Sequence, residues 1–431
     1  MYRLPVGRFK IDINSMILYN CHLRKPPTTI EEQRPCLLVQ TTDGWLKILD
    51  ACSGECLRSA FVSSIIKFSS LDWADYYHTI QLKSTVSQIR RSGSRGLPPP
   101  TSDRLMIMYI FKIHPLQLAG SFSLNRSVFG AKIRDAELSE DVLVVSHSNN
   151  TFNFYSFRWM LKHCTVLEAS LGEWLEMDGG GRCGIVGEPG FGVPLTMNIK
   201  ECPPLLFTTQ SSLGYGVQFG GSPAVFCHNS VPKFPDVFHI RALSGRHLVA
   251  ELKNECPTMN DDVANFHFDN YQRFIHIHGC TYSSYKIRHA DGQPHRLEKQ
   301  YSVDFKQQSP IGYQLEQQDT PVITLSGRVV KRRSTDGGFN DLSSSLHKVE
   351  LEDEVDLVFA VVTLPAGDDD VSAYLFFLDD KTGTILKTVE IPTWKQGLSN
   401  LIDYELDCIL HVVQDGATST CHYYRLTRTK R

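Results

Sequence analysis

Residues 37–57 read LLVQTTDGWLKILDACSGECL, and this stretch decides the fold class. Short apolar runs of strand length alternate in it with an Asp-Gly turn and a Ser-Gly turn. This pattern is typical of consecutive antiparallel hairpins. The stretch therefore predicts a protein built of antiparallel β-strands.

The second turn of this stretch recurs along the chain. Its copies are LDACSGECL (residues 49–57), IRALSGRHL (240–248), LDDKTGTIL (378–386) and the weaker IRHADGQPH (287–295). The shared glycines are Gly54, Gly245, Gly292 and Gly383, with successive spacings of 191, 47 and 91 residues. These spacings are near four, one and two multiples of a single period, and four-stranded propeller blades repeat every ~40–50 residues.

We therefore predict an all-β protein, a degenerate β-propeller of about seven four-stranded blades with loop insertions and at most one or two short helices. Coincidence is the alternative, because glycine-closed hairpin turns are common in any β protein. The repeated glycine itself has a structural role. The residue that re-enters a strand after a type I turn has a positive φ, which glycine adopts without steric cost.

Composition suggests a soluble, intracellular globular protein. Of the 431 residues, 42% are hydrophobic and 21% charged, and the net charge of −3 gives no bulk attraction to nucleic acid or anionic membranes. Twelve cysteines without paired spacing indicate a reducing compartment. The N-terminus lacks the apolar core of a signal peptide, and no apolar run approaches the ~20 residues that span a bilayer.

One domain accounts for the chain. We expect a preceding segment at residues 1–36, a single propeller at 37–426 and a basic tail at 427–431. The polar stretches 84–103 and 332–346 are expected to be disordered insertions, because they cannot bury apolar area. Residues 157–174 carry the one helical stripe.

Two features suggest ligand sites. The glycine-rich residues 184–192, GIVGEPGFG, lack the Lys and the following helix of a phosphate-binding loop, so we interpret them as a structural loop. His276 and His278 fall on one face of an expected strand and would need a third ligand such as His267 or His289 to hold a metal. A strand surface or a hydrogen-bonded core is the favoured interpretation of the two histidines.

The remaining candidates carry no chemistry that we can assign. Cys52 and Cys56 flank a hairpin turn without a second pair to complete a zinc site, so we take them as ordinary thiols. Nucleophile motifs are absent from the sequence, and we predict no catalytic, cofactor-binding or metal-binding residue. The cluster Lys331, Arg332 and Arg333 is either a nuclear-import signal or the exposed exit of a strand.

Several longer strings resemble the cullin-4-associated factor 17 family, that of the nucleolar Woodhouse–Sakati syndrome protein. They run in order along the chain and are VFGAKIRDAELSEDVLVV, TFNFYSF, VGEPGFGVP, NIKECPPLLF, FGG at 219–221, VFHIRAL and SGRVVK. The resemblance implies a non-catalytic substrate receptor of a cullin-4 RING ubiquitin ligase, located in the nucleus and nucleolus. Its implied partners are the damaged-DNA-binding adaptor protein, the cullin-4 ligase and an unknown protein substrate. From the net charge and the short apolar runs we expect no direct nucleic-acid contact and no membrane span.

Two departures from the family limit what the resemblance implies. Family members have sequence ahead of the position matching Met1, so we expect an N-terminally shortened form. The Trp-Asp-x-Arg docking box is absent, and the nearest match is residues 72–75, DWAD. The alternative function is a ubiquitin-independent nucleolar scaffold, and a third is an enzyme that needs a metal at His276 and His278.

Overall fold

The structure is a computed structural model of the chain. It describes residues 7–11, 15–19, 35–74, 79–85, 103–139, 141–177, 180–211, 217–220, 225–229, 237–242, 248–253, 263–266, 273–290, 293–308, 345–352, 356–365, 371–405, 408–416 and 418–426. The predicted insertions lie outside these ranges, apart from residues 84–85, 103 and 345–346. The basic tail and the cluster Lys331, Arg332 and Arg333 also lie outside them.

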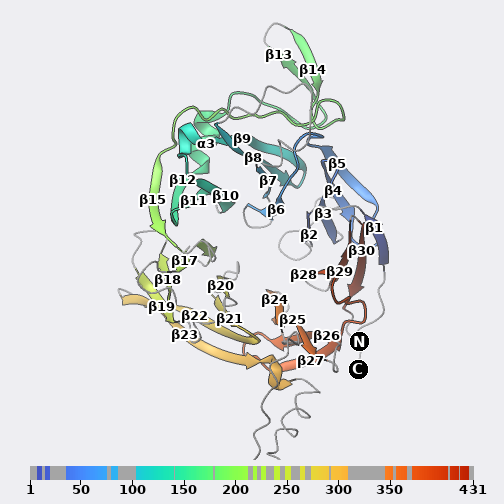
Figure 1. Cartoon of the computed structure of the whole chain (residues 1–431), viewed down its shortest axis with the longest axis vertical. Helices are drawn as coiled ribbons and strands as arrows, with labels where there is room; N and C mark the ends of the chain where they lie inside the picture. The colour runs from blue at the N-terminus through green and yellow to red at the C-terminus, as the bar shows by residue number, and fades with distance from the viewer. Residues whose placement is uncertain are drawn as a thin grey trace, which may run out of the picture. The chain divides into compact units, whose positions relative to one another are not determined.

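The described residues form seven antiparallel sheets of four strands (Figure 1). The first sheet consists of β2 (Ser15–Tyr19), β3 (Cys36–Gln40), β4 (Trp45–Asp50) and β5 (Cys56–Phe61). The second consists of β6 (Ser70–Trp73), β7 (Thr79–Thr85), β8 (Arg104–Ile113) and β9 (Leu116–Asn125). The third consists of β10 (Ile133–Ser139), β11 (Val142–His147), β12 (Thr151–Ser156) and β15 (Leu205–Gln210). The fourth sheet consists of β16 (Val217–Gly220), β17 (Val225–Asn229), β18 (Val237–Ala242) and β19 (Leu248–Lys253). The fifth consists of β20 (Val263–Phe266), β21 (Arg273–His278), β22 (Thr281–Ala290) and β23 (Gln293–Asp304). The sixth consists of β24 (Ser345–Glu352), β25 (Leu357–Pro365), β26 (Val371–Asp379) and β27 (Ile385–Glu390).

The seventh sheet joins the two ends of the chain. It contains β28 (Ser399–Glu405), β29 (Cys408–Asp415), β30 (Thr418–Arg425) and, as its outer strand, β1 (Gly7–Ile11). Strand β1 pairs antiparallel with β30, with Gly7 opposite Tyr423. The four-stranded sheets therefore begin at Gly7 and not at Leu37, and the expected preceding segment instead supplies strands β1 and β2. The sequence hid this because β1 finds its partner only at the far end of the chain.

The repeated turn occupies an equivalent place in each sheet that contains it. Gly54 and Gly383 each link the third strand to the fourth, with φ of 76° and 71°. In both turns the glycine amide donates to the carbonyl of the preceding Asp50 or Asp379 at 2.8 Å. The carboxylate of that Asp accepts two further backbone amides, at 2.8–3.1 Å.

The other two copies agree in chain position. Gly245 and Gly292 fall between β18 and β19 and between β22 and β23, again the third and fourth strands, although both glycines lie outside the described residues. The sequence repeat and the sheet repeat are therefore the same, as predicted.

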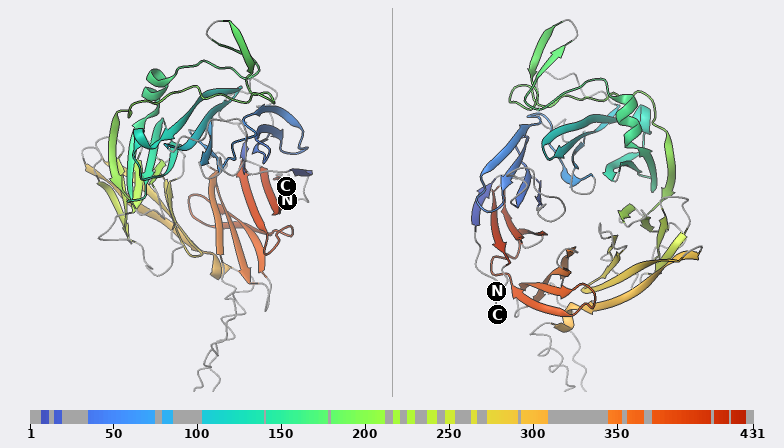
Figure 2. Two further views of the ribbon diagram at one scale, coloured as in Figure 1. Left: turned by 45° about the horizontal axis from the view of Figure 1, so that its top comes forward. Right: turned by 180° about the vertical axis from the view of Figure 1, so that it is seen from behind.

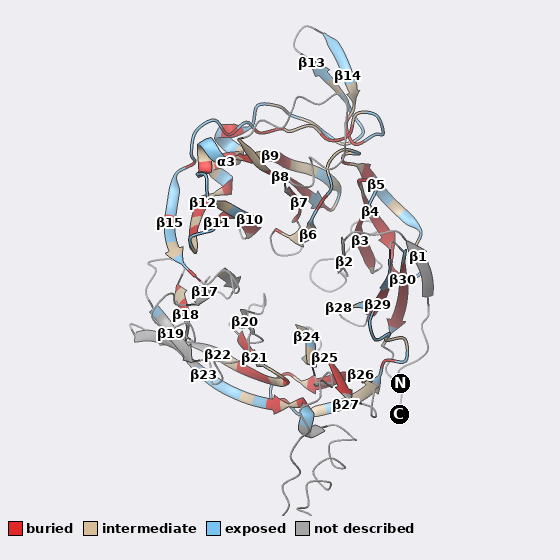
Figure 3. Cartoon of the chain, viewed as in Figure 1, coloured by how far each residue is buried: buried red, intermediate tan, exposed pale blue. Residues whose placement is uncertain are grey.

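The chain comprises two compact units, whose cores are built alike. Unit 1 contains residues 1–219, 226–239 and 398–431, and unit 2 contains residues 220–225 and 240–397. In unit 1 strands β3 and β8 carry buried apolar runs, and in unit 2 strands β25 and β26 do the same (Figure 3). Buried apolar side chains of neighbouring sheets pack together within each unit.

Helices are few, as predicted, but the main one is shorter than expected. The described helices are α2 (Arg126–Phe129), α3 (Phe157–Cys164) and the 3-10 turn η2 (Phe305–Gln308). The predicted helix at 157–174 ends at Cys164 because Thr165 adopts extended geometry and caps the Leu161 carbonyl with its hydroxyl at 2.6 Å. Trp174, expected on that helix, instead begins a strand.

Candidate protein-interaction site

The third sheet carries a long insertion between its third and fourth strands. Residues 157–204 separate β12 from β15 and contain α3 and a hairpin of β13 (Trp174–Met177) and β14 (Gly181–Ile185). Ser156 caps α3 by accepting the Trp159 amide at 3.2 Å, and Phe157, Met160 and Cys164 bury one face of the helix. The insertion therefore starts from a fixed point on unit 1.

Residues 186–197 of the insertion form a strap, a name we keep for this segment. Gly187 accepts the Phe61 amide of β5 at 2.7 Å, and Val193 donates to Val62 at 3.0 Å. Thr196 and Met197 both donate to the Ser121 carbonyl of β9, at 3.1 and 2.9 Å. The strap thus binds the outer strands of the first two sheets.

The glycines of residues 184–192 serve this close approach. Gly192 has φ of 77°, and a Cβ there would lie 2.6 Å from the Val62 carbonyl oxygen. The amides of Gly187 and Gly192 donate to the carbonyls of Gly192 and Glu188, and so are not directed at an anion. These residues form a structural loop, as the sequence indicated.

The β13–β14 hairpin projects from the rest of unit 1 (Figure 2). Trp174 is 51% exposed, and the Arg182 guanidinium lies over its ring at 5.6 Å. The base of the hairpin is held by backbone hydrogen bonds from Gly172 to Val186 and from Val186 to Glu173. The hairpin therefore presents an aromatic side chain on an ordered support.

Exposed apolar side chains gather in and after this insertion. Seven large hydrophobic residues are exposed in the described part of the chain, and four of them are Val166, Trp174, Leu205 and Leu206. Single exposed apolar residues are ordinary on a protein surface, but four of the seven fall within one segment of the chain, from α3 to β15. The region from α3 to β15 is therefore the best candidate for a partner surface.

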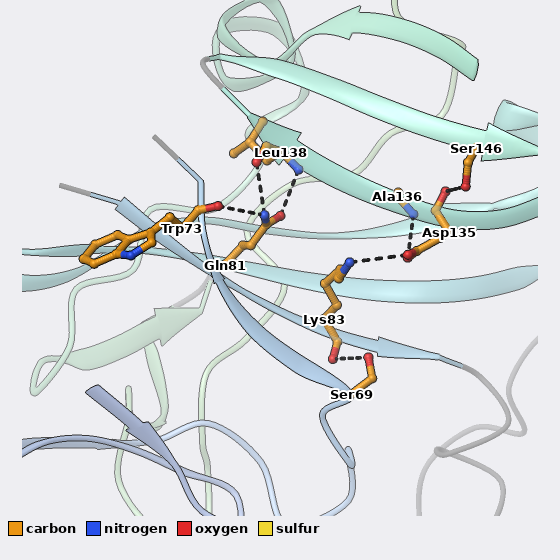
Figure 4. A network of polar contacts seen from close by, with 8 residues as sticks. All are labelled: Ser69, Trp73, Gln81, Lys83, Asp135, Ala136, Leu138 and Ser146. Atoms are coloured by element: carbon orange, nitrogen blue, oxygen red, sulfur yellow. Dashed lines mark hydrogen bonds and ion pairs between the residues drawn. The ribbon is translucent and has the colours of Figure 1, made fainter. Parts of the chain in front are cut away.

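Side-chain hydrogen bonds hold the sheets beneath this region together (Figure 4). The fully buried amide of Gln81 on β7 accepts the Leu138 amide of β10 at 2.8 Å and donates to the Leu138 and Trp73 carbonyls at 3.0 and 3.1 Å. Lys83 pairs with Asp135 at 3.5 Å alongside. The second and third sheets are thus connected by an uncharged, fully satisfied amide.

A charged pair has the same role in unit 2. Arg273 of β21 contacts the Asp380 carboxylate at 2.9 Å and donates to its backbone carbonyl at 2.8 Å. Burial raises the pKa of the Asp380 carboxyl, and Arg273 opposes that rise. The fifth sheet (β20–β23) and the sixth sheet (β24–β27) are thus connected through a charged pair.

The histidines suggested for a metal do not form a site in the described residues. His276 is buried on β21 opposite Ser283, and Cys280 lies in a hydrophobic cluster. Within the described ranges, no group of three or more His, Cys, Asp or Glu side chains is arranged to hold a metal ion. His267 and the side chains of His278 and His289 lie outside what the structure describes.

Other predicted features are placed as follows. Cys52 and Cys56 are free, exposed thiols, as expected. None of the described helices is long and apolar enough to cross a membrane. Sequence reasoning missed Trp174 as an exposed hairpin residue and the Gln81 connection, and only the Gly-Pro density around the strap hinted at an unusual insertion.

Comparisons with known proteins agree on fold and family. The β-propeller domain of Cps50 (Swd1) from Myceliophteria thermophila covers 99% of this chain and 100% of its own, with a TM-score of 0.50 and 8% identity. That likeness confirms the predicted β-propeller fold and nothing more.

Sequence relatives are more specific. The profile of DDB1- and CUL4-associated factor 17 matches residues 1–426. Proteins of that name from Danio rerio and Homo sapiens are 32% and 26% identical to this chain; each alignment covers 99% of the chain, with 80% and 81% of the relative. The chain belongs to the DDB1- and CUL4-associated factor 17 family.

Proposed function

We propose that this chain associates with DDB1 and, through it, with a CUL4 ubiquitin ligase, to which it presents a protein substrate. The observation that carries the proposal is the family match over residues 1–426, because the relatives are named for these two partners. The propeller fold supports it, since ordered sheets can display loops and outer strands to partners without chemistry of their own.

The chain acts in this proposal as a binding platform, and ubiquitin transfer belongs to other subunits. Two features support this role: the exposed apolar residues of the third sheet and its insertion, and the side-chain contacts that hold neighbouring sheets together. Rigid support lowers the ordering cost of binding a partner.

Localisation in the nucleus and nucleolus is part of the proposal. Its support is the basic cluster Lys331, Arg332 and Arg333, which has the composition of a short import signal. Replacing the three residues by alanine should shift a fluorescently tagged chain toward the cytoplasm. An unchanged distribution would remove the cluster from the proposal.

Immunoprecipitation of the chain at endogenous levels tests the function. DDB1 and CUL4 should both be recovered, and CUL4 should disappear when DDB1 is depleted, because the adaptor bridges the two. Nuclease treatment should leave the recovery unchanged. Recovery of ribonucleoproteins without DDB1 would contradict the proposal and favour the ubiquitin-independent scaffold.

A further inference from the structure

Strand β15 is an outer strand of unusual composition. Its six residues, LLFTTQ, contain no charge, and it ends the sheet order β10-β11-β12-β15. Leu205 is 53% exposed and Leu206 46% exposed, and Thr208 is exposed as well. Most of β15 is coloured as exposed in Figure 3. An uncharged, exposed outer strand is a template for pairing with another chain.

The other outer strands are protected by charge or by a covering segment. Five of them carry charged residues: Arg58 on β5, Glu251 and Lys253 on β19, Arg296, Glu298 and Lys299 on β23, Lys387 and Glu390 on β27, and Arg8 and Lys10 on β1. The sixth, β9, is uncharged, but the strap binds its Ser121 backbone. Among the described residues the strap reaches β9 and not β15, so β15 lacks both protections.

The inner edge of β15 is firmly held. Phe207 stacks on Phe154 of β12 with ring centroids 4.0 Å apart, and the Thr208 hydroxyl donates to Asn153 at 2.9 Å. A register shift where Leu205 and Phe207 pair with β12 places Leu206 between the two paired residues. The strand is therefore ordered before any partner arrives, which lowers the cost of binding.

We propose that β15 docks an extended, uncharged segment of a partner protein, which adds to this sheet as a fifth strand. Main-chain hydrogen bonds supply affinity in this mode, and alternate side chains supply selectivity. A charged side chain placed against LLFTTQ would lose water without meeting a counter-charge, so the segment is aliphatic or β-branched. Six residues of strand span about 20 Å, which sets the length of the segment.

The docking does not depend on the ligase association. If that association also holds, the segment belongs to the substrate and not to DDB1. Binding to DDB1 and binding to a peptide can therefore be measured separately on the same variants.

The test uses the full chain and a fluorescein-labelled eight-residue peptide of alternating valine and threonine. Its fluorescence anisotropy should rise on titration with the chain. Leu206→Lys should weaken the affinity at least tenfold, because the lysine puts a charge on the outer edge. The matched control Leu386→Lys, at a 56% exposed position on the charged strand β27, should bind as the unchanged chain does.

A second peptide with proline at a central position tests the backbone bonds, since proline lacks the amide donor. It should bind at least tenfold more weakly. No anisotropy change with the unchanged chain, equal binding by Leu206→Lys, or equal binding of the proline peptide would each overturn the proposal. A dimer seen by analytical ultracentrifugation and dissociated by Leu206→Lys would also overturn it, because a second copy would then occupy the edge.

Discussion

In unit 1 a neutral side chain connects two neighbouring sheets, whereas in unit 2 a charged pair connects two neighbouring sheets. In unit 1 the neutral amide of Gln81 bonds the Leu138 backbone, and in unit 2 the ionised Arg273 bonds Asp380. Both donors reach a backbone carbonyl of the next sheet, at 3.0 and 2.8 Å. A neutral hydrogen bond and a charged pair therefore make equivalent connections between sheets, and we expect the stability that each provides to respond differently to mutation and to pH.

Removing Arg273 should have the largest effect. Arg273→Ala leaves the Asp380 carboxylate buried without its counter-charge, and we expect a loss of about 3–5 kcal/mol in the free energy of unfolding. Urea unfolding measures it. The double variant Arg273→Ala/Asp380→Ala should lose less, and a larger loss in the double variant would show that the two residues act independently.

The same variant has a pH signature. Burial raises the pKa of the Asp380 carboxyl and Arg273 lowers it, so Arg273→Ala raises that pKa further. A raised carboxyl pKa lets the folded state take up a proton more readily than the unfolded state, so the deficit of Arg273→Ala should shrink as the pH falls. A deficit that grows on acidification would contradict the assigned pair.

Removing Gln81 should cost less and show no such pH signature. Gln81→Ala leaves the amide and carbonyl of Leu138 without their buried partner, and we expect a loss of about 2–3 kcal/mol in the free energy of unfolding. The difference from the unchanged chain should be the same at pH 5 and pH 8. Leu82→Ala would not serve as a control because it creates a cavity, so the exposed Leu386→Ala is the matched comparison.

A buried histidine in the seventh sheet (β28–β30 and β1) adds a sensitivity of stability to acid, which has to be separated from these effects. His411 is 1% exposed, bonds Asn400 at 3.1 Å and stacks on His422, with ring centroids 5.9 Å apart. Burial first, and then His422, lowers the pKa of His411 to about 3.

Because the pKa of His411 is lowered in the folded state, its contribution to the free energy of unfolding should depend on pH. The unfolded histidine binds a proton below about pH 6.5 while the folded one stays neutral, so stability present above that pH is lost on acidification, about 2 kcal/mol by pH 5. Thermal midpoints across this range measure the slope. His411→Gln should lower the slope by one proton, and an unchanged slope would contradict the neutral assignment.

The two repeated turns offer the smallest and most closely matched comparison. Asp50 is 8% exposed and its bonds to two backbone amides are partly buried, whereas Asp379 is half-buried and its bonds to the two equivalent amides are exposed. Asp50→Ala should cost about 1.5 kcal/mol and Asp379→Ala about 0.5 kcal/mol, because exposed amides recover bonds to water. Equal losses in urea unfolding would show that burial of the turn does not matter.

Local chemistry made much of the fold predictable from the sequence. The Asp and Gly of the turn frame act within six residues, so the frame at Gly54 and Gly383 identified the third-to-fourth strand connection in sheets far apart in the chain. The spacing of the four glycines then gave the approximate number of blades, and seven four-stranded sheets are present in the described part of the chain.

Features that depend on distant partners could not be predicted in this way. Gln81 and Leu138 are 57 residues apart, and β1 pairs with β30 across the length of the chain. Neither Gln81 nor residues 7–11 carry a local pattern that names the partner. The outer position of β15 was equally hidden, because exposure of Leu205 depends on which strand ends the sheet.

Light scattering of the purified chain mixed with purified DDB1 tests the central claim most directly. We expect a single species with the summed mass of one copy of each protein, unchanged by the Leu206→Lys substitution. Two separate species at micromolar concentrations, with the chain folded by its circular dichroism, would contradict its assignment as a DDB1-associated interaction subunit.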